Sequence, residues 1–188
     1  KDGVWKYYYD TGQLSMQEQF NNGVLNGEFI SFHLTGRLNV MANYVDGKVE
    51  GEVKWYDAFG LLYEVNTFRH SNRQGLAKRY YSSSQLLDSF YLSNGYIDGE
   101  YLSYHPNGLI SSTAVYNEGE QNGECFEYFS NGKLSLKGFF KDGVQEGEWK
   151  YYYPNGRMKR RIYFSDGLTV GEVVDYHYNG EVESVQYY

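Results

Sequence analysis

Residues 147–156 read Gly-Glu-Trp-Lys-Tyr-Tyr-Tyr-Pro-Asn-Gly, a run of strand-forming residues that ends in a turn. Aromatic side chains favour the half-buried surface of a β-sheet. Pro-Asn-Gly supplies a turn, because Pro presets φ and Asn and Gly tolerate positive φ. A second extended stretch follows from Arg157 to Phe164, and Ser165-Asp166-Gly167 makes the next turn. The stretch therefore predicts a β-hairpin.

The hairpin is one of eight repeats, because a glycine returns every 24 residues without insertion or deletion. We number positions from this first glycine, which begins each repeat: Gly3, Gly27, Gly51, Gly75, Gly99, Gly123, Gly147 and Gly171. Turn glycines recur at positions 10 and 21, with Ser84 and Ser71 as the exceptions. Such a period indicates a repeat architecture. We predict an all-β fold, an elongated single array of antiparallel hairpins over residues 1–188 in which the last repeat is truncated.

Composition limits the functions that the chain can have. Its 22 Tyr, 11 Phe and 3 Trp fit β structure, and its net charge of −7 disfavours a general nucleic-acid binder. Cys125 is the only cysteine, which excludes an intramolecular disulfide and a zinc site made of several thiolates. No run of 18 apolar residues exists, so the sequence predicts no membrane-spanning helix.

Three uniform columns are predicted to form the core. Position 6 is always aromatic, position 12 is always aliphatic, and position 18 is aromatic with one Leu. Positions 3, 5 and 7 vary more, and alternation along a strand places them opposite position 6. We predict that they form a surface that contacts a partner. The alternative is that these positions vary because nothing constrains them.

Candidate partner-binding residues follow from this assignment, since Tyr and Trp are enriched in interface hot spots. They are Trp5, Tyr7 and Tyr9 at one end, Trp55 in the middle, and Trp149, Tyr151 and Tyr153 near the other end. The irregular stretch 66–84 adds Arg69, Arg73 and Arg79, although drift is the alternative explanation for that stretch. Together with His70 and Lys78 these arginines form one basic cluster, and a second comprises Arg157, Lys159, Arg160 and Arg161. The two basic clusters suit an acidic protein surface or anionic lipid head groups, with a solvated face as the alternative.

No set of residues in the sequence predicts a catalytic, cofactor or metal site. His33, His105 and His177 share position 7, but at about 10 Å per repeat they lie about 30 Å apart, too far to share an ion. The glutamates at position 2 approach the carboxylate spacing of glycosidases, yet a feature repeated six times indicates a structural role. We expect them to bond turn amides or to pair with Lys6, Lys54, Lys150 and their neighbours. Cys125 is expected to be a packed thiol.

The stretches at 147–156, 138–143 and 3–9 resemble the bacterial variant of the MORN repeat. This resemblance covers essentially the whole chain and implies an array of antiparallel hairpins with no catalytic residues. It implies a role in protein association or scaffolding, and membrane attachment in some relatives. Some bacterial relatives are similar to antitoxins, and others to secreted or surface proteins, which favours the cell envelope or secretion over the cytoplasm.

The sequence predicts a non-enzymatic module that binds a protein partner. Adhesion through exposed aromatic rings that stack on glycans is one alternative, and neutralisation of a partner toxin is another. A hydrolase with paired glutamates is the least favoured.

Overall fold

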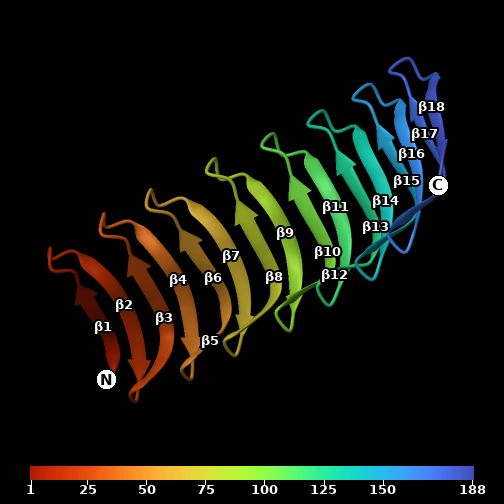
Figure 1. Ribbon diagram of the computed structural model, residues 1–188. Helices are drawn as coiled ribbons and strands as arrows, with labels where there is room; N and C mark the ends of the chain where they lie inside the picture. The colour runs from red at the N-terminus through yellow and green to blue at the C-terminus, as the bar shows by residue number, and fades with distance from the viewer. The chain divides into compact units, whose positions relative to one another are not determined.

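The computed structural model describes residues 1–188, which form 18 β-strands and no helix (Figure 1). The chain divides into two compact units, residues 1–95 (unit 1) and residues 96–188 (unit 2). Unit 1 contains β1 (Gly3–Tyr8), β2 (Leu14–Asn21), β3 (Val24–Phe32), β4 (Leu38–Val45), β5 (Lys48–Val49), β6 (Gly51–Tyr56), β7 (Leu62–Arg69), β8 (Asn72–Tyr80) and β9 (Leu86–Ser93). Unit 2 contains β10 (Tyr96–Tyr104), β11 (Ile110–Asn117), β12 (Glu120–Gln121), β13 (Gly123–Tyr128), β14 (Leu134–Lys141), β15 (Val144–Tyr152), β16 (Met158–Ser165), β17 (Leu168–Tyr176) and β18 (Val182–Tyr187).

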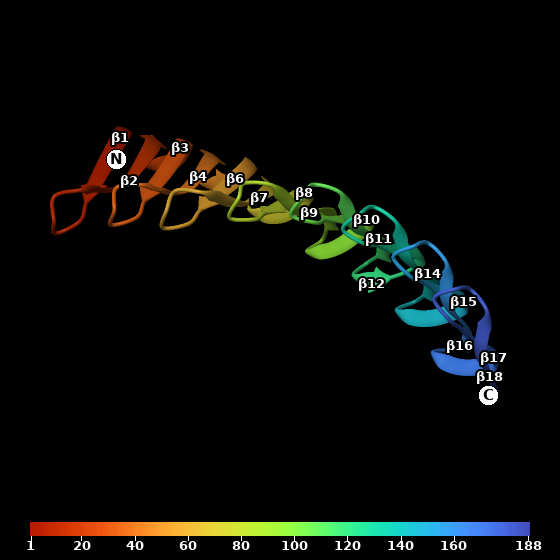
Figure 2. The same cartoon turned by 90° about the horizontal axis from the view of Figure 1, so that it is seen from above.

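Within each unit the strands follow one another in chain order as antiparallel neighbours (Figures 1 and 2). In the repeat that begins at Gly147, position 1 pairs with position 18, position 3 with position 16, and position 5 with position 14. The other complete repeats keep this register. The predicted all-β hairpin array is therefore confirmed.

The turn glycines are explained by backbone geometry. Asp142 and Gly143 have φ of 48° and 78°, and Asp166 and Gly167 have 50° and 75°. Two successive residues with positive φ form the type I′ turn that suits the twist of a hairpin. Ser71 and Ser84, where glycine is missing, still adopt φ of 67° and 65°. The turns of the irregular stretch are thus preserved despite these two serines.

The first glycine of each repeat lies in a β-bulge and not in a turn. Between β14 and β15, Lys137 pairs with Lys150 and Phe139 with Glu146, so residues 147–149 lie opposite Gly138 alone. Gly147 has φ of 71°, a backbone conformation that glycine adopts at little cost. The bulge brings position 3 of one repeat over position 16 of the preceding repeat.

The core differs from the prediction. Its most buried side chains lie at positions 3 and 16, among them Val53, Ala77, Cys125 and Trp149 at position 3 and Asn66, Phe90 and Ala114 at position 16. Position 18 packs against position 3, as predicted for a core column: the Phe140 and Trp149 rings are 5.0 Å apart. Most side chains at positions 6 and 12 are only half-buried, and Tyr8 is 60% exposed. The prediction that positions 6 and 12 form the core, with position 3 on the exposed side, is wrong.

Within each unit the sheet therefore has two chemically distinct faces. We call the side with positions 3, 5, 14, 16 and 18 the aromatic face, and the side with positions 2, 4, 15 and 17 the glutamate face. On the glutamate face Lys54 pairs with Glu52 at 3.4 Å, and Lys150 with Glu148 at 2.6 Å, as predicted for the glutamate column. The hydroxyl of Tyr163 also donates to Glu148, at 2.9 Å. The two lysine pairs each lie within one strand, whereas the Tyr163 hydrogen bond joins β16 to β15, and the ion pair of Lys137 with Glu124, at 2.8 Å, joins β14 to β13.

Candidate functional site

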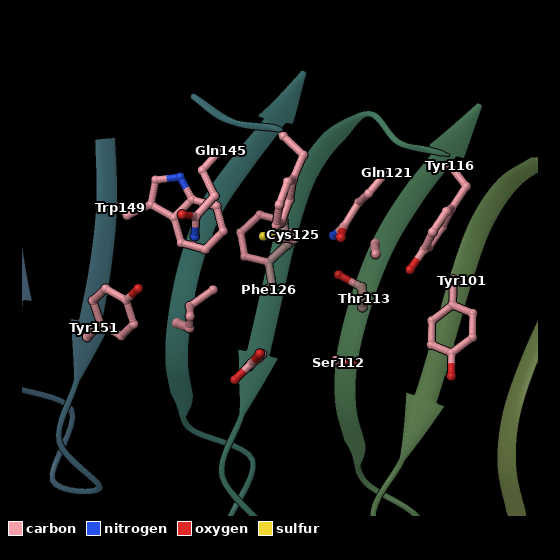
Figure 3. Close-up of a pocket in the computed structure, with 14 residues that line it drawn as sticks. Tyr101, Ser112, Thr113, Tyr116, Gln121, Cys125, Phe126, Gln145, Trp149 and Tyr151 are labelled. Atoms are coloured by element: carbon pink, nitrogen blue, oxygen red, sulfur yellow. The ribbon is translucent and has the colours of Figure 1, made fainter. Parts of the chain in front are cut away.

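The aromatic face of unit 2 carries a hollow of about 430 Å³, which is the candidate site (Figure 3). Its lining comes from five successive long strands, β10, β11, β13, β14 and β15, and from β12. Trp149 and Tyr151 lie on one side of the hollow, Tyr101 and Tyr116 lie on the other, and Cys125 lies between them. The remaining lining residues are Ser112, Thr113, Ala114, Gln121, Phe126, Glu127, Leu136, Phe140 and Gln145. We call this feature the unit 2 hollow.

The hollow exists because a small side chain stands between two large ones. Position 3 of three successive repeats is Tyr101, Cys125 and Trp149, and Cys125 is flanked across the sheet by Gly138. Ala114, also small, is buried beside Cys125 in the same cluster. Where neighbouring repeats place a ring at position 3, this repeat has only a thiol, so the surface sinks between the flanking rings.

Trp149 forms the firm wall of the hollow. It is 3% exposed, and its ring lies at an edge-to-face angle against Phe140 and against Phe164, with centroids 5.0 Å and 5.8 Å away. Such ring pairs each stabilise the fold by about 0.5–1.5 kcal/mol beyond area burial. The indole also lies directly on Gly138, since a Cβ there would be 2.5 Å from the Trp149 Cδ2 atom. Its Nε1 is buried and has no hydrogen-bond partner.

The electrostatic character of the hollow is acidic. Burial, together with the nearby carboxylates of Glu127 and Glu124, raises the pKa of Cys125 to about 11, although a backbone hydrogen bond from Gly138 opposes the shift. Burial also raises the pKa of Tyr151, and Glu127 adds to that shift while Arg160 opposes it. No lysine, arginine or histidine lines the hollow. The Cys125 thiol is thus held neutral, which makes it a packed side chain and a poor nucleophile, as its sequence context predicted.

Glu127 is the one charged residue that lines the hollow, and it forms no ion pair. Across the sheet it lies opposite Ser112 on one side and Leu136 on the other. Asp175 holds the same position 5 two repeats later, but Arg160 faces it and donates to its carboxylate at 2.6 Å. The Arg160 guanidinium accordingly lowers the pKa of Asp175. Only Glu127 leaves an uncompensated carboxylate at the edge of the hollow.

Unit 1 fills the same face with polar networks. Arg73 donates to Asn66 and to Glu64, both at 2.8 Å, and Asn66 is 2% exposed. Arg79 donates to the buried Asp88 at 2.9 Å and places its guanidinium 5.6 Å from the Phe90 ring centre. Arg73 and Arg79 were predicted to contact a partner, but in the structure both side chains form hydrogen bonds within unit 1. Arg69, the third predicted arginine, is exposed at the end of β7.

The predicted aromatic residues have several different environments. Trp149, a candidate partner contact, is buried against Gly138 and its aromatic neighbours, so it supports the wall of the hollow and exposes little of its own surface. Tyr151 is half-buried and lines the hollow, and its role as a partner contact stays a prediction. Trp55 is half-buried against Phe68, with ring centres 6.1 Å apart. Trp5 is 42% exposed beside Tyr7 on the aromatic face of unit 1.

Position 7 is not part of the aromatic face. The first strand of each hairpin ends at position 6, so the alternation of side chains between the two faces stops before position 7. The side chain at position 7 turns towards the next repeat. The hydroxyls of Tyr9 and Tyr153 donate to the carbonyls of Phe32 and Tyr176, at 2.6 Å and 2.8 Å. The histidines do the same: Nε2 of His105 lies 2.7 Å from the Tyr128 carbonyl, and Nε2 of His33 is 2.8 Å from that of Tyr56. The prediction that Tyr9 and Tyr153 share a recognition surface with positions 3 and 5 is wrong, because these side chains link neighbouring repeats.

The sequence interpretation missed most of the hollow, including Tyr101, Tyr116, Gln121, Gln145 and Glu127. The available signal was at positions 3 and 16, where Cys125, Ala114 and Gly138 are small between large residues. No group of three or more His, Cys, Asp or Glu side chains is arranged to hold a metal ion. The chain also lacks any helix that is long and apolar enough to cross a bilayer.

Comparison with known families agrees with this architecture. The model of the MORN repeat variant matches four segments, residues 1–22, 97–118, 121–142 and 145–166, each of which covers one hairpin and its turn. Four hairpins of this chain therefore match the MORN repeat variant. Three of the four matched repeats lie in unit 2 and contribute the strands that line the hollow. MORN repeats are in general modules for protein or membrane interaction, and proteins built from them are generally non-enzymatic.

Other comparisons add little to the MORN assignment. No curated protein matches the chain. Among solved structures, a chain of the "Crystal Structure of TcdB2-TccC3-Cdc42" is similar over 92% of this chain, with 13% identity and a TM-score of 0.22. This chain spans 13% of the length of that chain.

Proposed function

We propose that this MORN-repeat chain is a non-enzymatic module that associates with a protein partner through the aromatic face of unit 2. The observation that carries the proposal is the unit 2 hollow, a concave site of about 430 Å³ that is walled by tyrosine and tryptophan and has a polar edge. Protein interfaces are enriched in aromatic residues and place their strongest contacts in such desolvated pockets.

Rigidity supports this choice of surface. The walls of the hollow belong to paired strands, and Trp149 is fixed by Phe140, Phe164 and Gly138. A preformed site loses little conformational entropy when it binds. Tyr151 is the wall residue best suited to contact a partner, because it lines the hollow while part of its surface remains exposed.

The test compares two tyrosine substitutions on opposite faces of unit 2. Tyr151→Ala removes a ring from the hollow, whereas Tyr163→Ala removes a half-buried ring from the glutamate face. Partners are captured with the parent chain and identified by mass spectrometry, and their affinities for both variants are then measured. We expect Tyr151→Ala to weaken binding by more than about tenfold, as for a hot-spot residue, and Tyr163→Ala to leave it nearly unchanged.

Far-UV circular dichroism and thermal melting establish that both variants remain folded. If every captured partner binds Tyr151→Ala as tightly as the parent, the hollow is not the association surface. A glycan array serves as the second arm. Glycan binding that depends on Tyr151, without any protein partner, would replace protein association by carbohydrate adhesion.

A further inference from the structure

The first repeat shows how this aromatic face receives a positive charge. Nζ of Lys1 lies over three rings, 5.1 Å from the centre of Trp5, 4.9 Å from Tyr7 and 4.7 Å from Phe20. It also donates a hydrogen bond to the Tyr7 hydroxyl. The three rings stand at positions 3, 5 and 18 of their repeat. A cation within about 6 Å of an aromatic centre is attracted by the negative face of the ring.

The same three residue types recur at the same positions in the repeat that begins at Gly147, as Trp149, Tyr151 and Phe164. Lys1 lies two residues before the first glycine of its repeat, and the corresponding residue before Gly147 is Gln145. Before Gly123 it is Gln121, and both glutamines line the unit 2 hollow. Unit 2 thus repeats the aromatic residues that surround the Lys1 ammonium in the first repeat. At the position that corresponds to Lys1, however, it carries the neutral amides of Gln121 and Gln145.

Unit 1 repeats the pattern at a second place. Arg73 lies two residues before Gly75, and its guanidinium reaches Asn66 and Glu64 on the aromatic face. The residue at this point in the repeat therefore delivers a cation to the aromatic face in two of the unit 1 repeats. Gln121 and Gln145 are uncharged and cannot supply a cation, and no lysine, arginine or histidine lines the hollow.

Glu127 supplies the matching negative charge. It lines the hollow, it has no ion pair, and the residues opposite it across the sheet, Ser112 and Leu136, are uncharged. The floor of the hollow, with Ala114 and Cys125, is apolar. Lysine and arginine bury their aliphatic stems on apolar surface while the charged head seeks a polar group. A hollow with an apolar floor, aromatic walls and one unpaired carboxylate at its edge is complementary to such a side chain.

We propose that the unit 2 hollow binds a basic side chain, lysine or arginine, that projects from the protein partner, with Glu127 as its counter-ion. The aliphatic stem lies over Ala114 and Cys125, and the charged head lies between Glu127 and the walls formed by Tyr151 and Tyr116. This proposal rests on the proposed association function and names the chemistry of the partner residue that enters the site.

The probes for the test are N-acetyl-lysine N-methylamide and its norleucine analogue, which has the same linear stem without the ammonium. Each is titrated into isotope-labelled full chain, and the backbone amide signals of Cys125, Glu127 and Tyr151 are followed by NMR. We expect the lysine probe to shift these signals and to bind at least about threefold more tightly than the norleucine probe, the ratio that a weak exposed ion pair supplies. An arginine probe should behave as the lysine probe does.

Two substitutions isolate the roles of the residues. Glu127→Gln should weaken binding of the lysine probe by about threefold and leave the norleucine probe unaffected. Glu100→Gln is the matched control, because it removes the same charge from the glutamate face of unit 2. Gln145→Lys should place an internal ammonium over Trp149 and Tyr151, as Lys1 does over Trp5 and Tyr7, and should abolish binding of the lysine probe.

Equal binding of the lysine and norleucine probes, or equal binding of the lysine probe by the parent and Glu127→Gln, would overturn the proposal. The association function is judged separately. If a captured partner is lost with Tyr151→Ala but binds Glu127→Gln as tightly as the parent, the hollow is an association site that does not select a basic side chain.

Discussion

Gly138→Ala tests the packing on which the unit 2 hollow depends. Gly138 is the only one of the 22 glycines without a positive φ, so an alanine there meets no backbone strain. The obstacle is Trp149, whose ring atoms would lie 2.5 to 2.6 Å from the new Cβ. Carbon atoms in contact are normally about 3.5–4.0 Å apart, so the indole would have to move by about 1 Å.

The cost follows from what that movement disturbs. Overpacking a core typically costs about 1–3 kcal/mol, and the ring contacts of Trp149 with Phe140 and Phe164 lose part of their contribution of about 0.5–1.5 kcal/mol each. Replacing a strand glycine with alanine recovers about 0.5–1 kcal/mol of conformational entropy. We therefore expect Gly138→Ala to lower the free energy of unfolding by about 2 kcal/mol.

Urea denaturation measures this change. With a slope of about 2 kcal/mol per molar, the midpoint of unfolding should fall by about 1 M. The fluorescence of Trp149 should move to longer wavelength in the native state, because a displaced indole meets water. The control is the same substitution in a Trp149→Ala background, where the clash is gone and Gly138→Ala should be neutral or mildly stabilising. An unchanged midpoint in the parent background, or an equal loss in both backgrounds, would refute the packing argument.

Three further outcomes are expected. Arg79→Leu should cost about 2 kcal/mol of stability in chemical denaturation, because it removes a hydrogen-bonding cation from the carboxylate of Asp88, which is 2% exposed; the further change Asp88→Leu should restore most of the loss. Tyr153→Phe should cost about 1 kcal/mol through loss of the hydrogen bond to the Tyr176 carbonyl, while Tyr178→Phe, at an exposed ring, should cost almost nothing. The pKa of Cys125 is raised on folding from 9.0 to about 11, so its neutral thiol stabilises the fold fully below about pH 9, and that contribution is lost as the pH rises towards 11; Cys125→Ala should therefore show a smaller decline in unfolding free energy over this range than the parent.

The glycine spacing was sufficient to predict the strands and the turns. Turn glycines constrain φ locally, and this information is contained in the residues themselves. The turn predicted at Ser165-Asp166-Gly167 is a type I′ turn between β16 and β17. The glutamate column was also interpreted correctly, since Glu52 and Glu148 pair with the expected lysines.

The choice of the core face could not be made from column uniformity. The uniform aromatic residues at position 6 were interpreted as buried. The register of the hairpin shifts by one residue between positions 5 and 6, however, so that position 6 pairs with position 12 and not with position 13. There its ring lies over the glutamate face: the Tyr56 hydroxyl is 3.6 Å from Sδ of Met41, which pairs with Lys54. Alternation along the strand correctly placed positions 3 and 5 on the other side. What it could not give is the bulge that lays position 3 over position 16 of the preceding repeat and buries it.

The hollow itself depends on pairs that the register creates between distant residues. Glu127 and Asp175 occupy the same position 5 in their repeats, and from the sequence the two carboxylates are equivalent. Only the register shows that Asp175 faces Arg160 whereas Glu127 faces Ser112 and Leu136. The same holds for Arg73 and Arg79, which look like free cations in the sequence and are ion-paired in the structure.

Charge compensation, more than aromatic content, distinguishes the candidate site from the rest of the aromatic face. Rings occur on this face in both units, yet where polar residues join them they come in balanced sets, such as Arg79 with Asp88 and Arg160 with Asp175. Such an ion pair stabilises the fold, and because its charges cancel, it produces little electrostatic potential that a partner could recognise. Glu127 is an exception in unit 2: its carboxylate faces neutral neighbours at the edge of a hollow whose neighbouring glutamines bring no cation. Because an exposed carboxylate is solvated at little cost, the fold tolerates this imbalance, and a partner that brings the missing positive charge gains both the ion pair and the aromatic contacts.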